Sequence, residues 1–132
     1  MSKQQIRIDH ELRCNSQGII WNLISTAEGL SRWLADDVRQ DGDKLTLTWG
    51  ETWSHHEIRH ATITGKAKNR RIRFRWDDEE DAHAYIELMM EKSELTGDFI
   101  LTIIDFAEPE EEESLRDLWA DNLERLHTTT GL

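Results

Sequence analysis

Alternating charged and uncharged residues open the chain. Every second residue between positions 6 and 14 is uncharged, and Arg, Asp or Glu stands at each position between them. This period of two predicts a β-strand with one buried face. Asn15 and Ser16 then offer a helix N-cap, and the apolar residues at positions 19, 20, 23 and 24 fall on one helical face. We therefore expect a short helix directly after the strand.

A second helix start follows without an intervening loop. Ser25 and Glu28 have the spacing of a capping box, in which two side chains satisfy free backbone N–H groups of the first turn. Leu30, Trp33 and Leu34 supply the apolar residues of this second helix. The beginning of the chain thus predicts one strand and two short helices joined by a cap.

The centre of the chain returns to the two-residue period. Predicted strands lie around Val38 and at residues 44–49, 56–67, 71–76, 84–92 and 99–106. Turn signals separate them, among them Gly42 between two aspartates, the pair Asn69-Arg70, and Gly97. The acidic run at residues 77–81 predicts a solvated loop. Strands that follow one another without helices between them predict an antiparallel meander.

The period changes again near the end of the chain. Pro109 suits the first turn of a helix because its missing N–H costs nothing there, and the glutamates at positions 110–113 complement the helix dipole. An apolar stripe at helical spacing follows: Leu115, Leu118, Trp119, Asn122 and Leu126. We expect a long amphipathic helix over residues 110–128. The whole pattern predicts an α+β fold.

Composition changes this picture mainly through charge. The chain has 132 residues, with 16 Lys and Arg against 27 Asp and Glu, a net charge of −11. Such a field repels nucleic-acid backbones and anionic membrane surfaces, so we expect neither partner.

The sequence also indicates where the protein is located. We find no run of about 20 apolar residues and no signal-peptide core. The single cysteine, Cys14, fits a reducing compartment. We expect a cytoplasmic protein with one domain over residues 1–132.

Three segments carry a resemblance to a known family. Residues 20–38 read IWNLISTAEGLSRWLADDV, residues 72–82 read IRFRWDDEEDA, and residues 94–113 read ELTGDFILTIIDFAEPEEEE. With the order of elements, they resemble the START-like (Bet v 1-like) superfamily over essentially the whole chain. Small single-domain bacterial members are the most similar, and the branch resembling Hsp90-ATPase activators is more distant. The resemblance implies a helix-grip fold, in which a curved antiparallel sheet of about six or seven strands wraps the C-terminal helix and encloses a groove.

The resemblance also implies where a ligand would bind, because larger members of the superfamily hold sterols, lipids, plant hormones or polyketides in this groove. The residues expected to face it are Trp33, Leu47, Trp49, Phe74, Trp76, Leu88, Met90, Asp105, Leu115, Trp119, Asn122 and Leu126. Most are apolar, as in ligand pockets, and Asn122, Asp105 and His60 would supply polar groups. The alternative is that the same apolar faces form a packed core.

The remaining residues with reactive side chains give weaker signals. On a strand, His56 and His60 would lie about 13 Å apart, and His55 would point to the opposite face, so we expect no metal site. The acidic clusters are expected to be solvated. No Gly-rich phosphate loop or Gly-x-Ser-x-Gly nucleophile motif is found, so we assign no cofactor and no catalytic residue. Asp105 differs, because it lies in the apolar run FILTIIDF and would need a partner if buried.

A run of cationic residues follows one predicted strand. Arg71, Arg73 and Arg75 alternate with apolar residues and therefore share the outer face of the sheet. We expect them to form cross-strand pairs with Glu87 and Glu91. The alternative is a docking surface for an acidic protein partner or for a second copy of the chain.

These residues leave three hypotheses about function. The favoured one is a non-enzymatic domain that binds a small hydrophobic or amphipathic molecule in the groove. The second is a protein-interaction or cochaperone-like module with a packed core. The least favoured is a cyclase- or hydrolase-like enzyme, which would need a buried ionisable group in the groove. Substitution of Asp105, His60 and Asn122 would test this hypothesis.

Overall fold

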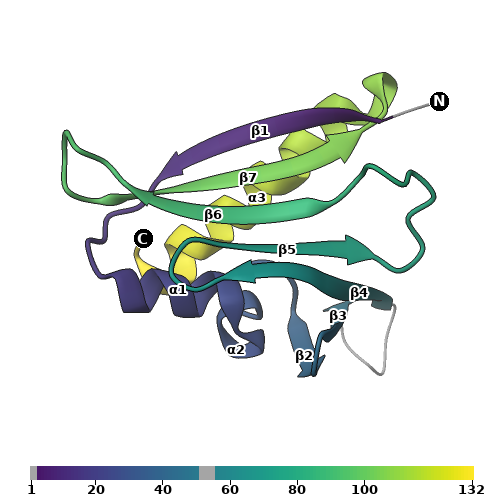
Figure 1. The fold of residues 1–132 in the computed structure, drawn as a ribbon, viewed down its shortest axis with the longest axis horizontal. Coiled ribbons are helices and arrows are strands. Elements are labelled where there is room, and N and C mark those ends of the chain that lie inside the picture. The colour runs from purple at the N-terminus through teal and green to yellow at the C-terminus, as the bar shows by residue number, and fades with distance from the viewer. Residues whose placement is uncertain (1–2, 51–55) are drawn as a thin grey trace.

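The computed structural model describes residues 3–50 and 56–132 (Figure 1). Its elements in chain order are β1 (Gln4–Glu11), α1 (Gln17–Ser25), α2 (Ala27–Leu30), β2 (Asp37–Asp41), β3 (Lys44–Gly50), β4 (His56–Ala67), β5 (Arg71–Trp76), β6 (Ile86–Lys92), β7 (Phe99–Ala107), the 3₁₀ turn η1 (Pro109–Glu111) and α3 (Glu112–Thr130). The order agrees with the predicted strand, two short helices, meander and long helix.

Seven strands form one antiparallel sheet in the order β1-β7-β6-β5-β4-β3-β2. Strands β2 to β7 pair with their neighbours in sequence, and β1 is added at the far edge, where Gln4 lies opposite Ala107 on β7. Figure 1 shows α3 crossing behind the strands, with its C-terminal end near α1. We call the face of the sheet beneath α3 the inner face and the opposite one the outer face. The predicted α+β helix-grip fold is confirmed.

The two short helices begin at different caps, one predicted and one not. Ser16 caps α1, as expected, by accepting a hydrogen bond from the N–H of Ile19. The predicted capping box at Ser25 is wrong, because Ser25 is still the last residue of α1 and its hydroxyl donates to the carbonyl of Trp21. Thr26 caps α2 instead, accepting from the N–H of Gly29 at 2.9 Å.

Several strand and helix ends also differ from the prediction. β1 ends at Glu11 rather than at residue 14, although Leu12 still donates its N–H to the carbonyl of Phe99. β6 begins at Ile86 rather than at residue 84. The predicted helix over residues 110–128 is a 3₁₀ turn followed by α3, which ends at Gly131 in the left-handed conformation (φ 78°). These shifts change no strand's buried face.

The core lies between the inner face, α3 and the two short helices. Trp33 is fully buried, donates its indole N–H to the carbonyl of Leu23 at 3.0 Å, and lies 6.2 Å from Trp119 between ring centres. α1 packs against β5 and β6. The part of the inner face around Trp33 is therefore covered by α3 and by the two short helices.

The three arginines predicted on the outer face lie there, but they have different partners. Arg71 and Arg73 each approach the carboxylate of Glu87 at 3.4 Å, so the predicted cross-strand pairing with Glu87 is confirmed. Among the described residues Glu91 forms no ion pair, so the predicted pairing with Glu91 is not observed. Arg75 instead donates to the carbonyls of Asp81, Ala82 and Ala84 at 2.6–3.1 Å, and so holds the loop between β5 and β6.

Candidate binding groove

A cavity of about 420 Å³ lies between α3 and the inner face of the sheet. It opens beside the N-terminal half of α3, where Leu115, Leu118, Trp119 and Asn122 line it. Their spacing of three and four residues places them on one face of the helix. The volume lies within the range of small-molecule sites.

Six of the predicted groove residues line this cavity: Trp49, Trp76, Asp105, Leu115, Trp119 and Asn122. The other six are Trp33, Leu47, Phe74, Leu88, Met90 and Leu126, and none of them is more than 5% exposed. They belong to the half of the inner face that the short helices help to cover. The groove is thus divided along its length into a packed half and a hollow half.

Residues that the sequence analysis did not assign complete the lining: Leu34, Glu57, Arg59, Ile86 and Leu118. Glu57 and Arg59 lie on the inner face of β4, opposite Trp49 and Leu47 of β3. His60 was expected in the groove, and this expectation is wrong. It lies on the outer face, exposed, with its Nδ1 3.2 Å from the hydroxyl of Thr46.

The histidine cluster does not converge on one point. His56 and His60 lie on the same, outer face of β4, and His55 lies outside the described residues. Within residues 3–50 and 56–132, no three His, Cys, Asp or Glu side chains gather as a metal site requires. The expectation that these histidines form no metal site stays a prediction.

Asp105 is the carboxylate of the hollow half that contacts α3. It lies on β7, and its Oδ2 accepts the indole N–H of Trp119 at 2.9 Å while its Oδ1 accepts the backbone N–H of Phe106 at 2.7 Å. Burial raises the pKa of Asp105 from 3.8 to about 6, although both hydrogen bonds and the charge of Lys3 oppose the increase. Burial dominates because a desolvated carboxyl disfavours its charged form.

Tryptophan rings form the walls of the cavity, and contacts with neighbouring residues hold them. Trp49 and Trp76 lie 6.2 Å apart between ring centres, and the indole N–H of Trp49 donates to the carbonyl of Leu34 at 3.1 Å. The guanidinium of Arg59 lies 3.9 Å above the ring of Trp76, while its Nη2 contacts the carboxylate of Asp78 at 3.1 Å. The rings are therefore fixed in place and do not fill the cavity themselves.

The far end of α3 is tied to the rest of the molecule. Asp36 accepts hydrogen bonds from Arg125 of α3 at 2.9 Å and from the backbone N–H of Gly50 at 2.6 Å. Thr129 of α3 donates its hydroxyl to the carbonyl of Arg32 at 3.1 Å. These contacts hold the C-terminal half of the helix, and the bond from Trp119 to Asp105 holds the half beside the cavity.

Comparison with known families agrees with this architecture. The profile of the START-like superfamily domain matches residues 1–132, the full length of the chain. The chain belongs to the START-like superfamily. No match was found among proteins of curated function.

Three solved structures illustrate the range of relatives of this START-like domain. A protein from Bacteroides fragilis is 39% identical, with a TM-score of 0.65 over 98% of this chain and 92% of that one. The Aha1 dimer from Colwellia psychrerythraea is 16% identical, with a TM-score of 0.67 over 99% and 98%. CalU16 from Micromonospora echinospora is 14% identical, with a TM-score of 0.72 over 96% and 76%. The last two likenesses concern the fold alone.

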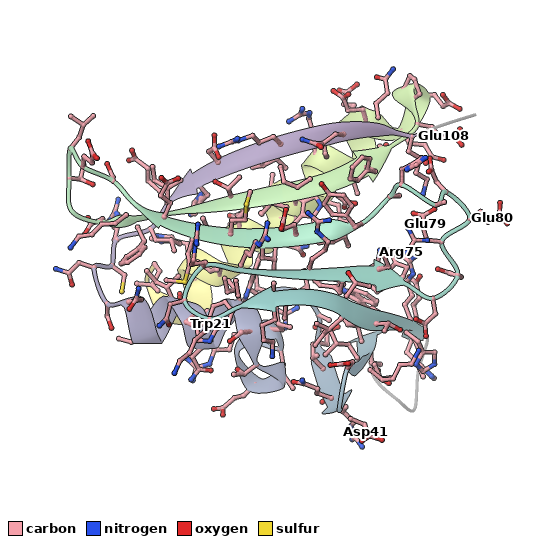
Figure 2. The ribbon with its side chains drawn as sticks, viewed as in Figure 1. Trp21, Asp41, Arg75, Glu79, Glu80 and Glu108 are labelled. Carbon is pink, nitrogen blue, oxygen red and sulfur yellow. The ribbon has the colours of Figure 1, made fainter. Side chains whose placement is uncertain are left out.

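A second, larger cavity of this START-like domain lies at the loop between β5 and β6. It measures about 640 Å³ and is lined by Lys3, by residues 78–82 and by Glu108. Figure 2 shows Glu79, Glu80 and Glu108 at this end of the sheet, beyond Arg75. The ammonium of Lys3 already contacts Glu79 at 2.8 Å. Because its lining is nearly all charged, this cavity suits water better than an apolar ligand, and the tryptophan-lined groove is the stronger candidate.

The described helices were also compared with the requirements of a membrane span. In the two segments that the structure describes, no helix combines the length and the apolar character needed to cross a bilayer.

Proposed function

We infer that this START-like domain binds a small amphipathic molecule in the hollow half of the groove between α3 and the inner face of the sheet. The observation that carries this proposal is the cavity of about 420 Å³ beside well-packed core residues. Protein interiors leave few voids larger than a water molecule, so a cavity of this size lined by tryptophan is typical of a binding site.

The lining supports an amphipathic ligand rather than a purely apolar one. Trp49, Trp76 and Trp119 offer large aromatic surfaces, whereas Asp105 and Asn122 place polar groups beside them. The indole N–H groups of Trp49 and Trp119 are already hydrogen-bonded within the protein. A ligand therefore meets walls that need little rearrangement, which lowers the entropy cost of binding.

Filling the groove tests the proposal. Leu118 lines the cavity but is 54% exposed, so a larger ring at this position can enter the groove without displacing the core. We expect native mass spectrometry of protein purified without detergent to show a copurified mass that is lost on denaturation. Added 1-octanol should shift the indole N–H signals of Trp49, Trp76 and Trp119, and Leu118→Trp should weaken this binding about tenfold, or about 1.4 kcal/mol.

The matched control is Leu95→Trp. Leu95 is 98% exposed in the turn between β6 and β7, outside the cavity, so this variant adds the same ring without touching the groove. It should bind 1-octanol like the wild type. If 1-octanol shifts none of the groove indoles in the wild type, the groove is closed to ligands and the proposal is wrong; the interaction-module hypothesis then takes its place.

A further inference from the structure

The charges that line the hollow half of the groove do not balance. Glu57, Arg59 and Asp105 are its charged residues. Arg59 is already neutralised, because its guanidinium contacts Asp78 at 3.1 Å and lies on the ring of Trp76. Within the described part of the chain, Glu57 forms no ion pair. The cavity therefore carries an excess of negative charge.

Within residues 3–50 and 56–132, no cationic group forms an ion pair with Asp105. Its two hydrogen-bond donors, the indole N–H of Trp119 and the backbone N–H of Phe106, are both neutral. Lys3 contributes to its electrostatic surroundings, but the ammonium of Lys3 is bonded to Glu79. A carboxylate has about four lone-pair positions, so each oxygen of Asp105 can accept one more donor.

The groups around Asp105 favour a positive charge. Trp119 and Asn122 are three residues apart on α3 and so neighbour each other on its surface, and among the residues described the amide of Asn122 has no hydrogen-bond partner. Its carbonyl oxygen is an acceptor, as is the carboxylate. The face of Trp49 also attracts cations through the negative potential of its ring, as the ring of Trp76 already does with Arg59.

We propose that the ligand is a primary amine on a small apolar body, with its ammonium group bound by Asp105 and Asn122 and its body against the rings of Trp49 and Trp76. This proposal rests on the proposed function, since it names the class of molecule that the same groove binds. The pairing supplies the cation that the buried carboxylate lacks, and a buried charge is tolerated well only when it is paired and hydrogen-bonded.

The test compares three probes that share one apolar chain: n-octylamine, 1-octanol and octanoate. Their dissociation constants are measured at pH 7.5 from the indole N–H shifts of the wild type. We expect n-octylamine to bind at least about tenfold more tightly than 1-octanol, because a hydrogen bond between two charged groups is stronger than one to a neutral hydroxyl. Octanoate should bind most weakly of the three.

Two variants test whether Asp105 and Asn122 bind the ammonium group. Asp105→Asn keeps the shape and an acceptor for Trp119 but removes the charge, so it should reduce the affinity for n-octylamine to that for 1-octanol. Asn122→Leu removes the amide at nearly constant volume and should weaken n-octylamine binding several-fold while leaving 1-octanol binding unchanged. Asp121→Asn, an exposed acid on the same helix outside the cavity, is the control and should leave all three affinities unchanged.

The outcomes separate this proposal from the proposed function. If 1-octanol binds but n-octylamine binds no better, or octanoate binds best, the groove is a ligand site and the amine proposal is overturned. If Asp105→Asn does not fold, Asn122→Leu alone decides, and unchanged n-octylamine affinity in that variant overturns the amine proposal. If none of the probes binds to the wild type, both proposals fail together.

Discussion

The indole N–H of Trp119 donates a hydrogen bond to Oδ2 of Asp105 across 2.9 Å. This bond links α3 to β7 inside a groove whose other walls are mostly apolar, and it orients both side chains. Trp119 also packs against Trp33 at 6.2 Å between ring centres. One residue therefore connects the packed half of the groove, through its ring, with the hollow half, through its N–H.

Replacing Trp119 by Phe separates these two roles. Trp119→Phe keeps an aromatic ring against Trp33 but removes the donor, so Asp105 loses one of its hydrogen bonds while it stays buried. We expect the free energy of unfolding to fall by about 1–3 kcal/mol, the usual cost of leaving a buried polar group unsatisfied together with the lost packing. Urea unfolding followed by circular dichroism measures this change.

A double-mutant cycle identifies the hydrogen bond as the cause. In the background of Asp105→Leu, which removes the acceptor, Trp119→Phe should cost clearly less than in the wild type, with an interaction energy of at least about 0.5 kcal/mol. Equal costs in both backgrounds would show that the ring, rather than the N–H of Trp119, accounts for the loss.

The raised pKa of Asp105 predicts how the stability depends on pH. Its pKa is about 6 in the folded protein and near 3.8 in the unfolded chain, so between these values the folded state binds more protons. The contribution of Asp105 to stability is therefore full below about pH 4 and is lost as the pH rises through 6. The total loss is about 3 kcal/mol, at 1.36 kcal/mol for each pKa unit.

Asp105→Asn isolates this contribution from those of other groups. Lys3 and Glu79 influence Asp105, Glu57 and Arg59 face it in the groove, and all of them are retained in the variant. Between pH 5 and pH 8 the wild type should lose about 1.4 kcal/mol more stability than the variant. Urea unfolding of both proteins at the two pH values provides the comparison, and parallel profiles would contradict a raised pKa.

The period of two in the sequence predicted which face each strand side chain takes, but not how far along the strand the groove stays open. Phe74 and Trp76 share the inner face, as expected, yet Phe74 is fully buried and Trp76 lines the cavity. The difference arises from α1, which packs on β5 and β6. Such packing depends on the tertiary arrangement, and no local pattern encodes it.

The error at His60 has a local cause. In β4, Ile58 and Ile63 are both apolar but fall on opposite faces, because they are five residues apart. The phase of this strand is therefore ambiguous in the sequence. Pairing with β3 resolves it, since Leu47 lies opposite Arg59 and Thr46 opposite His60. Extending the two-residue period from the buried Ala61 and Ile63 toward the N-terminus would have placed Arg59, and not His60, on the inner face.

Gly29 provides a test of the junction between the two short helices. A Cβ atom at this position would lie 2.0 Å from the carbonyl oxygen of Asn22 and 2.6 Å from the Cα of Leu23, both backbone atoms that cannot move freely. Gly29→Ala should therefore force α1 and α2 apart and destabilise the protein by about 3 kcal/mol or more, as overpacking of a tight site does. Thermal unfolding measures this loss.

Gly18→Ala is the matched control, because Gly18 lies in α1 with no atom within 4 Å of the added methyl group. The control should leave stability unchanged or raise it by up to about 0.5 kcal/mol, since alanine favours a helix more than glycine does. A similar small effect in both variants would show that the junction has room for a side chain.

His10 gives the opposite pH dependence to Asp105. It lies on β1 facing inward, and its Nε2 is buried without a hydrogen-bond partner among residues 3–50 and 56–132. Burial lowers the pKa of His10 below 6.5, and the nearby His127 lowers it further, against the effect of Glu11. The unfolded chain therefore binds a proton more readily, so this site costs stability as the pH falls below about 6.5.

His10→Leu should therefore stabilise the protein, and more at pH 5 than at pH 8. The variant replaces an unsatisfied buried nitrogen by an apolar group of similar size, a gain of about 1 kcal/mol at neutral pH, and it also removes the proton uptake of the unfolded state. Urea unfolding at both pH values tests this, with His83→Leu, at an exposed position of the loop between β5 and β6, as the control. If His10→Leu destabilises the protein at pH 5, the Nε2 of His10 has a partner in solution, and the buried nitrogen is not a cost to the fold.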